Sequence, residues 1–215
     1  MQYTVDVSII IAIFALYGFV HSLLASKKIK FLFKKIFGEL IAFYRLLYNV
    51  FALFTLYLIY EFSPKPNLLI YDLPNPYDLI VLIPQFLALA GIFWAFNFIC
   101  FKEFIGLDQI KRFLGKAYKT ELDEEMTLII KGPFRFSRHP LYFFSIIFLL
   151  FRPTMDLFYL TFFACIVVYF YIGSYHEEKK LTEHFGDIYS EYKKSVPRIF
   201  PLKIFKPYKE TFAES

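Results

Sequence analysis

The sequence is poor in cysteine and histidine, and this scarcity excludes several kinds of site. Its two cysteines, Cys100 and Cys165, each lie in an apolar run, where we expect packing residues and not a disulfide or a metal pair. The four histidines, at positions 21, 139, 176 and 184, are not spaced as metal ligands are. We therefore expect no metal site.

The N-terminus lacks the features of a cleavable signal. Positions 1–6 contain no lysine or arginine, and no small-residue cleavage site follows the first apolar run. We expect that run to remain as a membrane span.

Apolar and aromatic residues are abundant. Hydrophobic residues make up 58% of the 215 positions, with 30 Phe and 17 Tyr, and the mean hydropathy is +0.48. Soluble domains are nearer half apolar and far poorer in aromatic residues. The composition predicts an all-α membrane protein in which 1–215 form a single integral membrane domain.

Five apolar runs have the composition of membrane helices, at 7–25, 41–60, 79–101, 141–151 and 155–175. The fourth has only 11 residues, which as a helix rise about 16 Å, or half of a bilayer core. We interpret the last two runs as a helical hairpin whose open ends meet on one side. The expected fold is thus about five transmembrane helices with a cytoplasmic polar cap.

The positive charges predict the orientation. The connections 27–39, 102–138 and 177–215 contain 5, 8 and 8 Lys and Arg residues, whereas the loop 61–78 and the tip of the hairpin contain one each. Because positive residues concentrate in the cytoplasm, we place the N-terminus outside and 102–138 inside, in a prokaryotic inner membrane. The basic and aromatic segment 27–37 is typical of a membrane anchor, and we expect no nucleic-acid partner.

Two polar clusters flank the predicted hairpin. Arg138, His139 and Tyr142 precede or begin its first arm, and Glu177 and Glu178 follow its second. Ionisable groups at membrane depth are costly, so each is a candidate functional residue. The alternative is that Arg138 and Glu177 mark the interface as paired charges that reach toward the headgroups.

The spacing of these clusters resembles a known superfamily. Arg-His-Pro-Leu-Tyr at 138–142, Glu-Glu-x-x-Leu at 177–181, Phe-Gly-x-x-Tyr-x-x-Tyr at 185–192 and Val-Pro-Arg-x-x-Pro at 196–201 are similar to the isoprenylcysteine carboxyl methyltransferases and phospholipid methyltransferases. The resemblance implies that the hairpin and tail, 139–201, bind S-adenosylmethionine at the cytoplasmic membrane face. It implies that Arg138 is catalytic. It also implies a cofactor site, formed by His139, Leu141, Tyr142, Glu177, Glu178 and Tyr189.

The first two thirds of the chain resemble the bacterial methanethiol S-methyltransferases within that superfamily. The matching segments are 21–26, similar to His-Ser-x-x-Ala-Arg, 104–109, similar to Leu-Phe-Gly-Leu-Arg-Gln, and the turn 153–155. Ser26 and Asp108 stand where those proteins tend to have arginine. The resemblance favours a small lipophilic thiol as the methyl acceptor, with His21 as a second catalytic candidate that orients or deprotonates it.

Several alternatives stay open. The acceptor is a lipophilic small molecule or a lipid, including a prenylcysteine carboxylate or a phospholipid amine. Sterol reductases share the C-terminal layout but typically have asparagine where this chain has Leu141. A non-catalytic membrane partner that keeps the scaffold is a further interpretation. Arg198 contacts either the cofactor or a lipid headgroup, and the sequence leaves the oligomeric state open.

Overall fold

A computed structural model describes residues 1–117, 122, 127–202 and 208. Contacts between backbone positions divide the chain into two compact units, Met1–Asn67 with Cys100–Met126, and Leu68–Ile99 with Thr127–Ser215. The prediction of a single membrane domain stays a prediction. Parts of the predicted cytoplasmic connection and tail, 118–121, 123–126, 203–207 and 209–215, lie outside the described residues.

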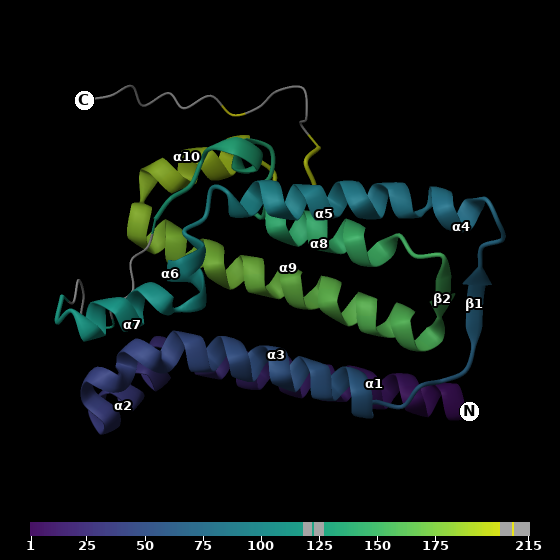
Figure 1. Ribbon diagram of the computed structural model, residues 1–215, viewed down its shortest axis with the longest axis horizontal. Helices are drawn as coiled ribbons and strands as arrows, with labels where there is room; N and C mark the ends of the chain where they lie inside the picture. The colour runs from purple at the N-terminus through teal and green to yellow at the C-terminus, as the bar shows by residue number, and fades with distance from the viewer. Residues whose placement is uncertain (118–121, 123–126, 203–207, 209–215) are drawn as a thin grey trace. The chain divides into compact units, whose positions relative to one another are not determined.

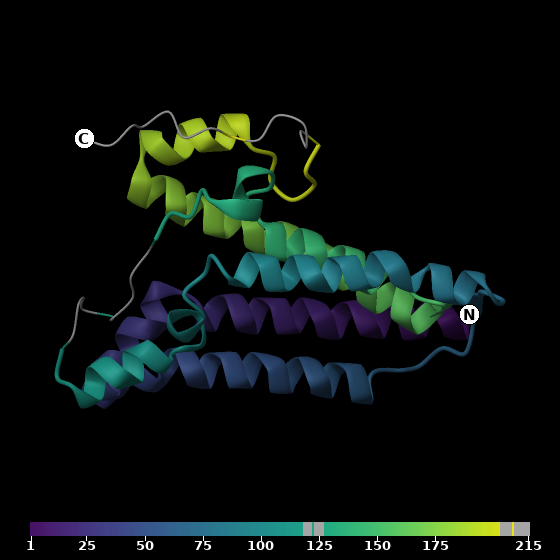
Figure 2. The ribbon, with the colours of Figure 1, turned by 45° about the horizontal axis from the view of Figure 1, so that its top comes forward.

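In the first unit, helices α1 (Gln2–Leu24) and α3 (Tyr44–Phe62) lie side by side (Figures 1 and 2). Between them in the sequence come the basic helix α2 (Lys27–Phe37) and the 3-10 helix η1 (Gly38–Phe43). Ser26 begins α2, because its hydroxyl accepts a hydrogen bond from the Ile29 amide. Gly38, with φ at 58°, ends it.

The same unit contains two short helices, α6 (Phe101–Ile105) and α7 (Leu107–Leu114), joined at Gly106. Arg45, in the first turn of α3, donates to the Glu103 carbonyl at 3.0 Å. Arg112 binds both carboxylate oxygens of Glu103, at 2.9 and 3.1 Å. Charge-assisted pairs of this bidentate kind fix the geometry of this corner.

The second unit is built on three helices, α5 (Leu82–Phe96), α8 (Pro140–Leu150) and α9 (Leu157–Phe185), with the single turn α4 (Tyr77–Ile80) before α5. Figures 1 and 2 show α5 lying along α8. Gly91 of α5 makes this close approach possible, because a Cβ there would overlap the ring of Phe144 on α8.

A small sheet departs from the predicted all-α fold. Strand β1 (Leu69–Asp72), in the loop 61–78, pairs antiparallel with β2 (Thr154–Asp156), which follows α8. Thr154 donates to the Asp72 carboxylate at 2.8 Å, and Tyr71 donates to the Arg152 carbonyl at 3.2 Å. The sequence did not predict these strands because the pairing joins residues about 80 positions apart.

Helix α9 continues well past the predicted span 155–175. Asp156 begins it by accepting from the Tyr159 amide at 2.7 Å, and Gly186, with φ at 57°, ends it. Helix α10 (Asp187–Ser195) follows, and Tyr189 and Tyr192 pack in a buried cluster with Ile130 and Val196. Ile188 of the same helix is exposed. The glycine at 186 ends α9 and restarts the chain as a separate helix, so the two helices do not share one continuous face.

Within the part of the chain that the structure describes, four helical segments are long and apolar enough to cross a membrane: Gln2–Leu24, Lys27–Phe62, Tyr77–Phe96 and Leu157–Phe185. They correspond to four of the five predicted spans, and the chain is a membrane protein. The fifth prediction corresponds to α8, which is apolar but shorter. The segment that leads into α8 contains the 3-10 helix η2 (Gly132–Arg135).

Candidate functional site

The segment before α8 is held by the segment after α10. The amides of Arg138 and His139 donate to the carbonyls of Pro197 and Arg198, at 3.0 and 2.9 Å. Ser137, almost fully buried, donates through its hydroxyl to the Ile199 carbonyl at 2.7 Å. Two motifs about 60 residues apart in the sequence are thus paired through their backbones, which places Arg198 beside His139.

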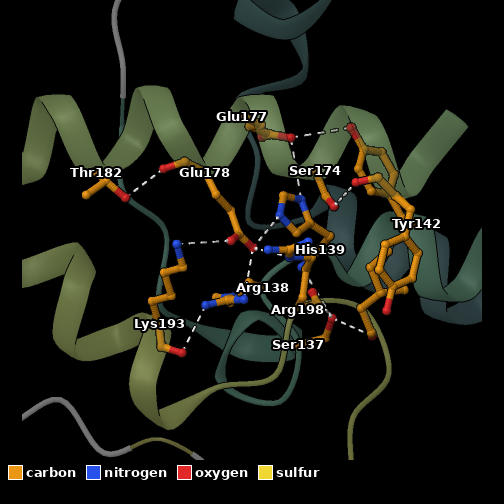
Figure 3. Close-up of polar contacts among 12 residues, drawn as sticks. Ser137, Arg138, His139, Tyr142, Ser174, Glu177, Glu178, Thr182, Lys193 and Arg198 are labelled. Carbon is orange, nitrogen blue, oxygen red and sulfur yellow. Dashed lines mark hydrogen bonds and ion pairs between the residues drawn. The ribbon is translucent and has the colours of Figure 1, made fainter. Parts of the chain in front are cut away.

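Glu178 of α9 lies at the centre of the site (Figure 3), and only 1% of its side chain is exposed. Its Oε1 lies 3.1 Å from an Arg138 nitrogen, 3.2 Å from His139 Nε2 and 3.3 Å from Arg198 Nε. The Lys193 amine is 3.8 Å from Oε2. A buried carboxylate needs such partners, because taking a charge out of water costs several kcal/mol.

The neighbouring Glu177 faces a different environment, with 52% of its side chain exposed. It accepts a hydrogen bond from the Tyr142 hydroxyl at 3.3 Å, and His139 Nδ1 lies 3.4 Å from the same carboxylate oxygen (Figure 3). The rings of His139 and Tyr142 stack at 5.2 Å, and Tyr142 stacks on Phe170 of α9 at 4.6 Å. An aromatic column therefore stands beside an accessible carboxylate.

The two ring nitrogens of His139 each face a carboxylate oxygen. Carboxylates only accept hydrogen bonds, and a histidine that donates from both nitrogens is the charged imidazolium. Burial lowers the pKa of His139, but hydrogen bonds and charge interactions with Glu177 and Glu178 outweigh it and raise the pKa above 6.5. The two carboxylates thus meet the cations Arg138, Lys193 and Arg198, and they also favour the charged form of His139.

Three buried polar atoms of this region have no hydrogen-bond partner among the described residues: Arg138 Nε, Glu178 Oε2 and the hydroxyl of Tyr189. Burial is the main cause that raises the pKa of Tyr189, and the charge of Glu178 raises it further. Tyr192 is satisfied, donating to the Phe134 carbonyl at 2.5 Å. Since buried polar groups are nearly always paired, these three atoms are candidate contacts for a polar ligand or water.

The structure brings most of the predicted site residues together. Arg138, His139 and Tyr142 at the start of α8 meet Glu177 and Glu178 of α9. Leu141 is half-buried in the first turn of α8. His21 belongs to the other unit, where its ring pairs with Tyr48. The roles assigned to these residues stay predictions.

Sequence reasoning missed four contributors: Ser137, Phe170, Lys193 and, as a partner of Glu178, Arg198. Arg198 lies in the Val-Pro-Arg motif, and the sequence left its contact open between cofactor and headgroup. The backbone pairing between the segment before α8 and the segment after α10 determines that Arg198 lies beside Glu178. No sequence signal marks Lys193 or Phe170, because their positions depend on how α10 and α9 pack.

Comparison with known proteins gives one informative match. Across 191 residues, or 88% of this chain, the sequence is 28% identical to methanethiol S-methyltransferase 1 of Bradyrhizobium diazoefficiens. The matched part covers 65% of that protein, so the chain spans less than two thirds of its relative. No family model and no solved structure matches. The similarity supports the relationship to methyltransferases that the motifs indicate.

Proposed function

We propose that the protein is an integral membrane methyltransferase that uses S-adenosylmethionine and methylates a small lipophilic acceptor, with a thiol favoured. The observation that carries the proposal is the charged cluster around Glu178, beside an aromatic column and an accessible carboxylate. The similarity to a methanethiol S-methyltransferase supports the same reaction class.

The residues present suit the polar part of this cofactor. Its amino-acid portion carries an ammonium and a carboxylate. Glu177, with its exposed carboxylate, is the group to hold the ammonium. Arg138, Lys193 and Arg198 exceed the two carboxylates by one charge without a proton on His139, which favours an added carboxylate near Arg198. Tyr189 offers an unpartnered hydroxyl among the described residues.

When bound, the cofactor supplies a sulfonium methyl: the acceptor sulfur bonds to the methyl carbon, the carbon–sulfonium bond breaks, its electron pair stays on the departing sulfur, and the thiol proton goes to solvent. The neutral rings of Tyr142 and Phe170 offer aromatic contacts to a cation, worth about 0.5–2 kcal/mol. Glu178 positions His139 and Arg138 by binding both. Orienting the reactants is the protein's main contribution in a displacement of this kind.

Binding of S-adenosylhomocysteine to the full chain in detergent, measured by calorimetry, tests the cofactor. We expect Glu177→Gln to weaken binding about tenfold, because a hydrogen bond to a charged group contributes roughly 1.5–3 kcal/mol and the exposure of Glu177 favours the low end of that range. Glu183→Gln removes the same charge from an exposed position of the same helix and is the matched control. A folded wild-type protein that binds neither the donor nor its product would support the non-catalytic scaffold instead.

The acceptor is tested with a radiolabelled methyl donor and a panel of acceptors. We expect transfer to short alkyl thiols and not to a prenylcysteine or a phospholipid. Transfer to one of the latter two, with thiols inactive, would identify the alternative acceptor classes.

A further inference from the structure

A cavity of about 300 Å³ lies in the first unit, between α1 and α3. Its lining residues recur at helical spacing on one face of each helix: positions 13, 16, 17, 20 and 21 of α1, and 51, 52, 55, 58 and 59 of α3. Most of these side chains are aliphatic or aromatic. Ala52 and Thr55, the small residues on α3, leave the space that larger side chains would fill.

One end of this cavity is polar. His21 lines it, and the imidazole is paired through Nε2 with the hydroxyl of Tyr48, one turn before Ala52. The His21 ring lies between two tyrosines, 4.7 Å from the ring of Tyr48 and 5.6 Å from that of Tyr17. The Tyr17 hydroxyl donates to the Ala52 carbonyl at 3.5 Å. A mostly apolar cavity with a few convergent polar groups is the usual form of a small-molecule site.

We propose that this cavity binds the methyl acceptor, and that the acceptor is a small thiol whose sulfur contacts His21 while its alkyl group packs against Ala52 and Thr55. Tyr48 is a positioning residue that fixes the imidazole. This inference rests on the proposed methyltransferase function, and it narrows the acceptor class.

The volume suits the smaller acceptors, and a larger one would have to extend beyond the cavity. One liquid water occupies about 30 Å³, so 300 Å³ holds roughly ten non-hydrogen atoms. A short alkyl thiol fits within that space. A prenylcysteine has about twice as many non-hydrogen atoms, and a phospholipid has more. The hydroxyl of Thr55 already donates to the carbonyls of Phe51 and Ala52, at 2.7 and 3.1 Å. We therefore assign the polar contact with the thiol group of the acceptor to His21.

The first experiment measures binding of propane-1-thiol to the full chain in lipid nanodiscs, by calorimetry without a methyl donor and with empty nanodiscs subtracted. We expect Ala52→Leu and Thr55→Leu, which fill the cavity, each to weaken thiol binding at least tenfold. Leu53→Phe adds similar bulk at a position of α3 that is 70% exposed and outside the cavity, and should leave binding unchanged. Equal binding by all four proteins would overturn the proposal.

The second experiment tests the His21 contact by comparing propane-1-thiol with methyl propyl sulfide, which lacks the S–H group. We expect the wild type to prefer the thiol, and His21→Phe and Tyr48→Phe to lose most of that preference while still binding the sulfide. A merely structural role would weaken both ligands equally, and that result would contradict the proposed contact.

Binding of S-adenosylhomocysteine separates this inference from the proposed function. If the cavity variants bind this product normally but lose the thiol, both proposals are supported. If the wild type binds the product and methylates thiols while Ala52→Leu does so equally well, the acceptor site lies elsewhere. If no protein binds the product, the proposed function fails, and thiol binding still reports on the cavity.

Discussion

Glu177 and Glu178 are neighbours in the sequence, yet 52% of one side chain and 1% of the other is exposed. The difference follows from helical geometry, since successive residues of α9 point about 100° apart. Glu178 faces Arg138 and the segment 197–199, whereas Glu177 faces Tyr142. The buried carboxylate organises the site, and the exposed one is available to a ligand.

This difference predicts that two matched substitutions change the stability of the fold by very different amounts. Glu178→Gln leaves Arg138, His139 and Arg198 without their shared anion, and breaking a buried ion pair typically costs about 3–5 kcal/mol. Glu177→Gln should change the free energy of unfolding by less than about 1 kcal/mol, because exposed pairs contribute little. Denaturant unfolding in detergent measures both. Equal destabilisation by the two variants would show that Glu178 is not the organising group.

His139 predicts how stability depends on pH. The pKa of His139 in the folded protein lies above its ordinary value of 6.5, so the folded state favours the charged ring. The stabilisation is therefore fully present below 6.5 and is lost as the pH rises through the folded-state value. We expect the melting temperature to fall across that window.

The control for this prediction is His139→Gln, which removes the titrating group while keeping a hydrogen-bond donor. Its melting temperature should be lower at acidic pH and nearly flat across the same range. A wild-type protein that gains stability as the pH rises above 6.5 would contradict the sign of the effect.

At the scale of helices, the contact of α5 with α8 depends on a glycine. A Cβ at Gly91 would overlap the ring of Phe144, so the ring or the helix would have to shift. We expect Gly91→Ala to destabilise the protein by about 1–3 kcal/mol, the usual cost of overpacking.

Gly173 of α9 is the matched control, because a Cβ there would lie 3.9 Å from the nearest atom, the Tyr142 hydroxyl oxygen. Gly173→Ala should be neutral or stabilise by up to about 1 kcal/mol through helix propensity. Thermal unfolding in the same detergent compares the two. If Gly91→Ala were as stable as Gly173→Ala, the α5–α8 contact would not be close-packed there.

For the whole molecule, the distribution of Lys and Arg predicts an external N-terminus and a cytoplasmic site. Alkaline phosphatase is active only outside the cytoplasm, and green fluorescent protein exported in unfolded form is fluorescent only inside. A phosphatase fused after Lys65 should be active, and a fluorescent protein fused after Leu202 should be fluorescent. The reverse pattern would place the Glu178 cluster on the outer face and contradict a cytoplasmic cofactor supply.

The apolar helices, and the polar residues that flank them, follow from the sequence alone. Hydropathy and length depend only on local composition, so four predicted spans correspond to helices long enough to cross a membrane. The pairing of Arg138 and His139 with Glu177 and Glu178 was also predictable, because a hairpin brings its open ends together.

The exposure and the neighbours of each charged group, in contrast, depend on the tertiary structure. The exposure of Glu177, the burial of Glu178, the place of Arg198 and the restart of the helix at Gly186 depend on contacts between distant segments. The same holds for the cavity beside His21, which needs the faces of α1 and α3 to meet. Side-chain surroundings are set by packing across the fold, and no local pattern in the sequence records them.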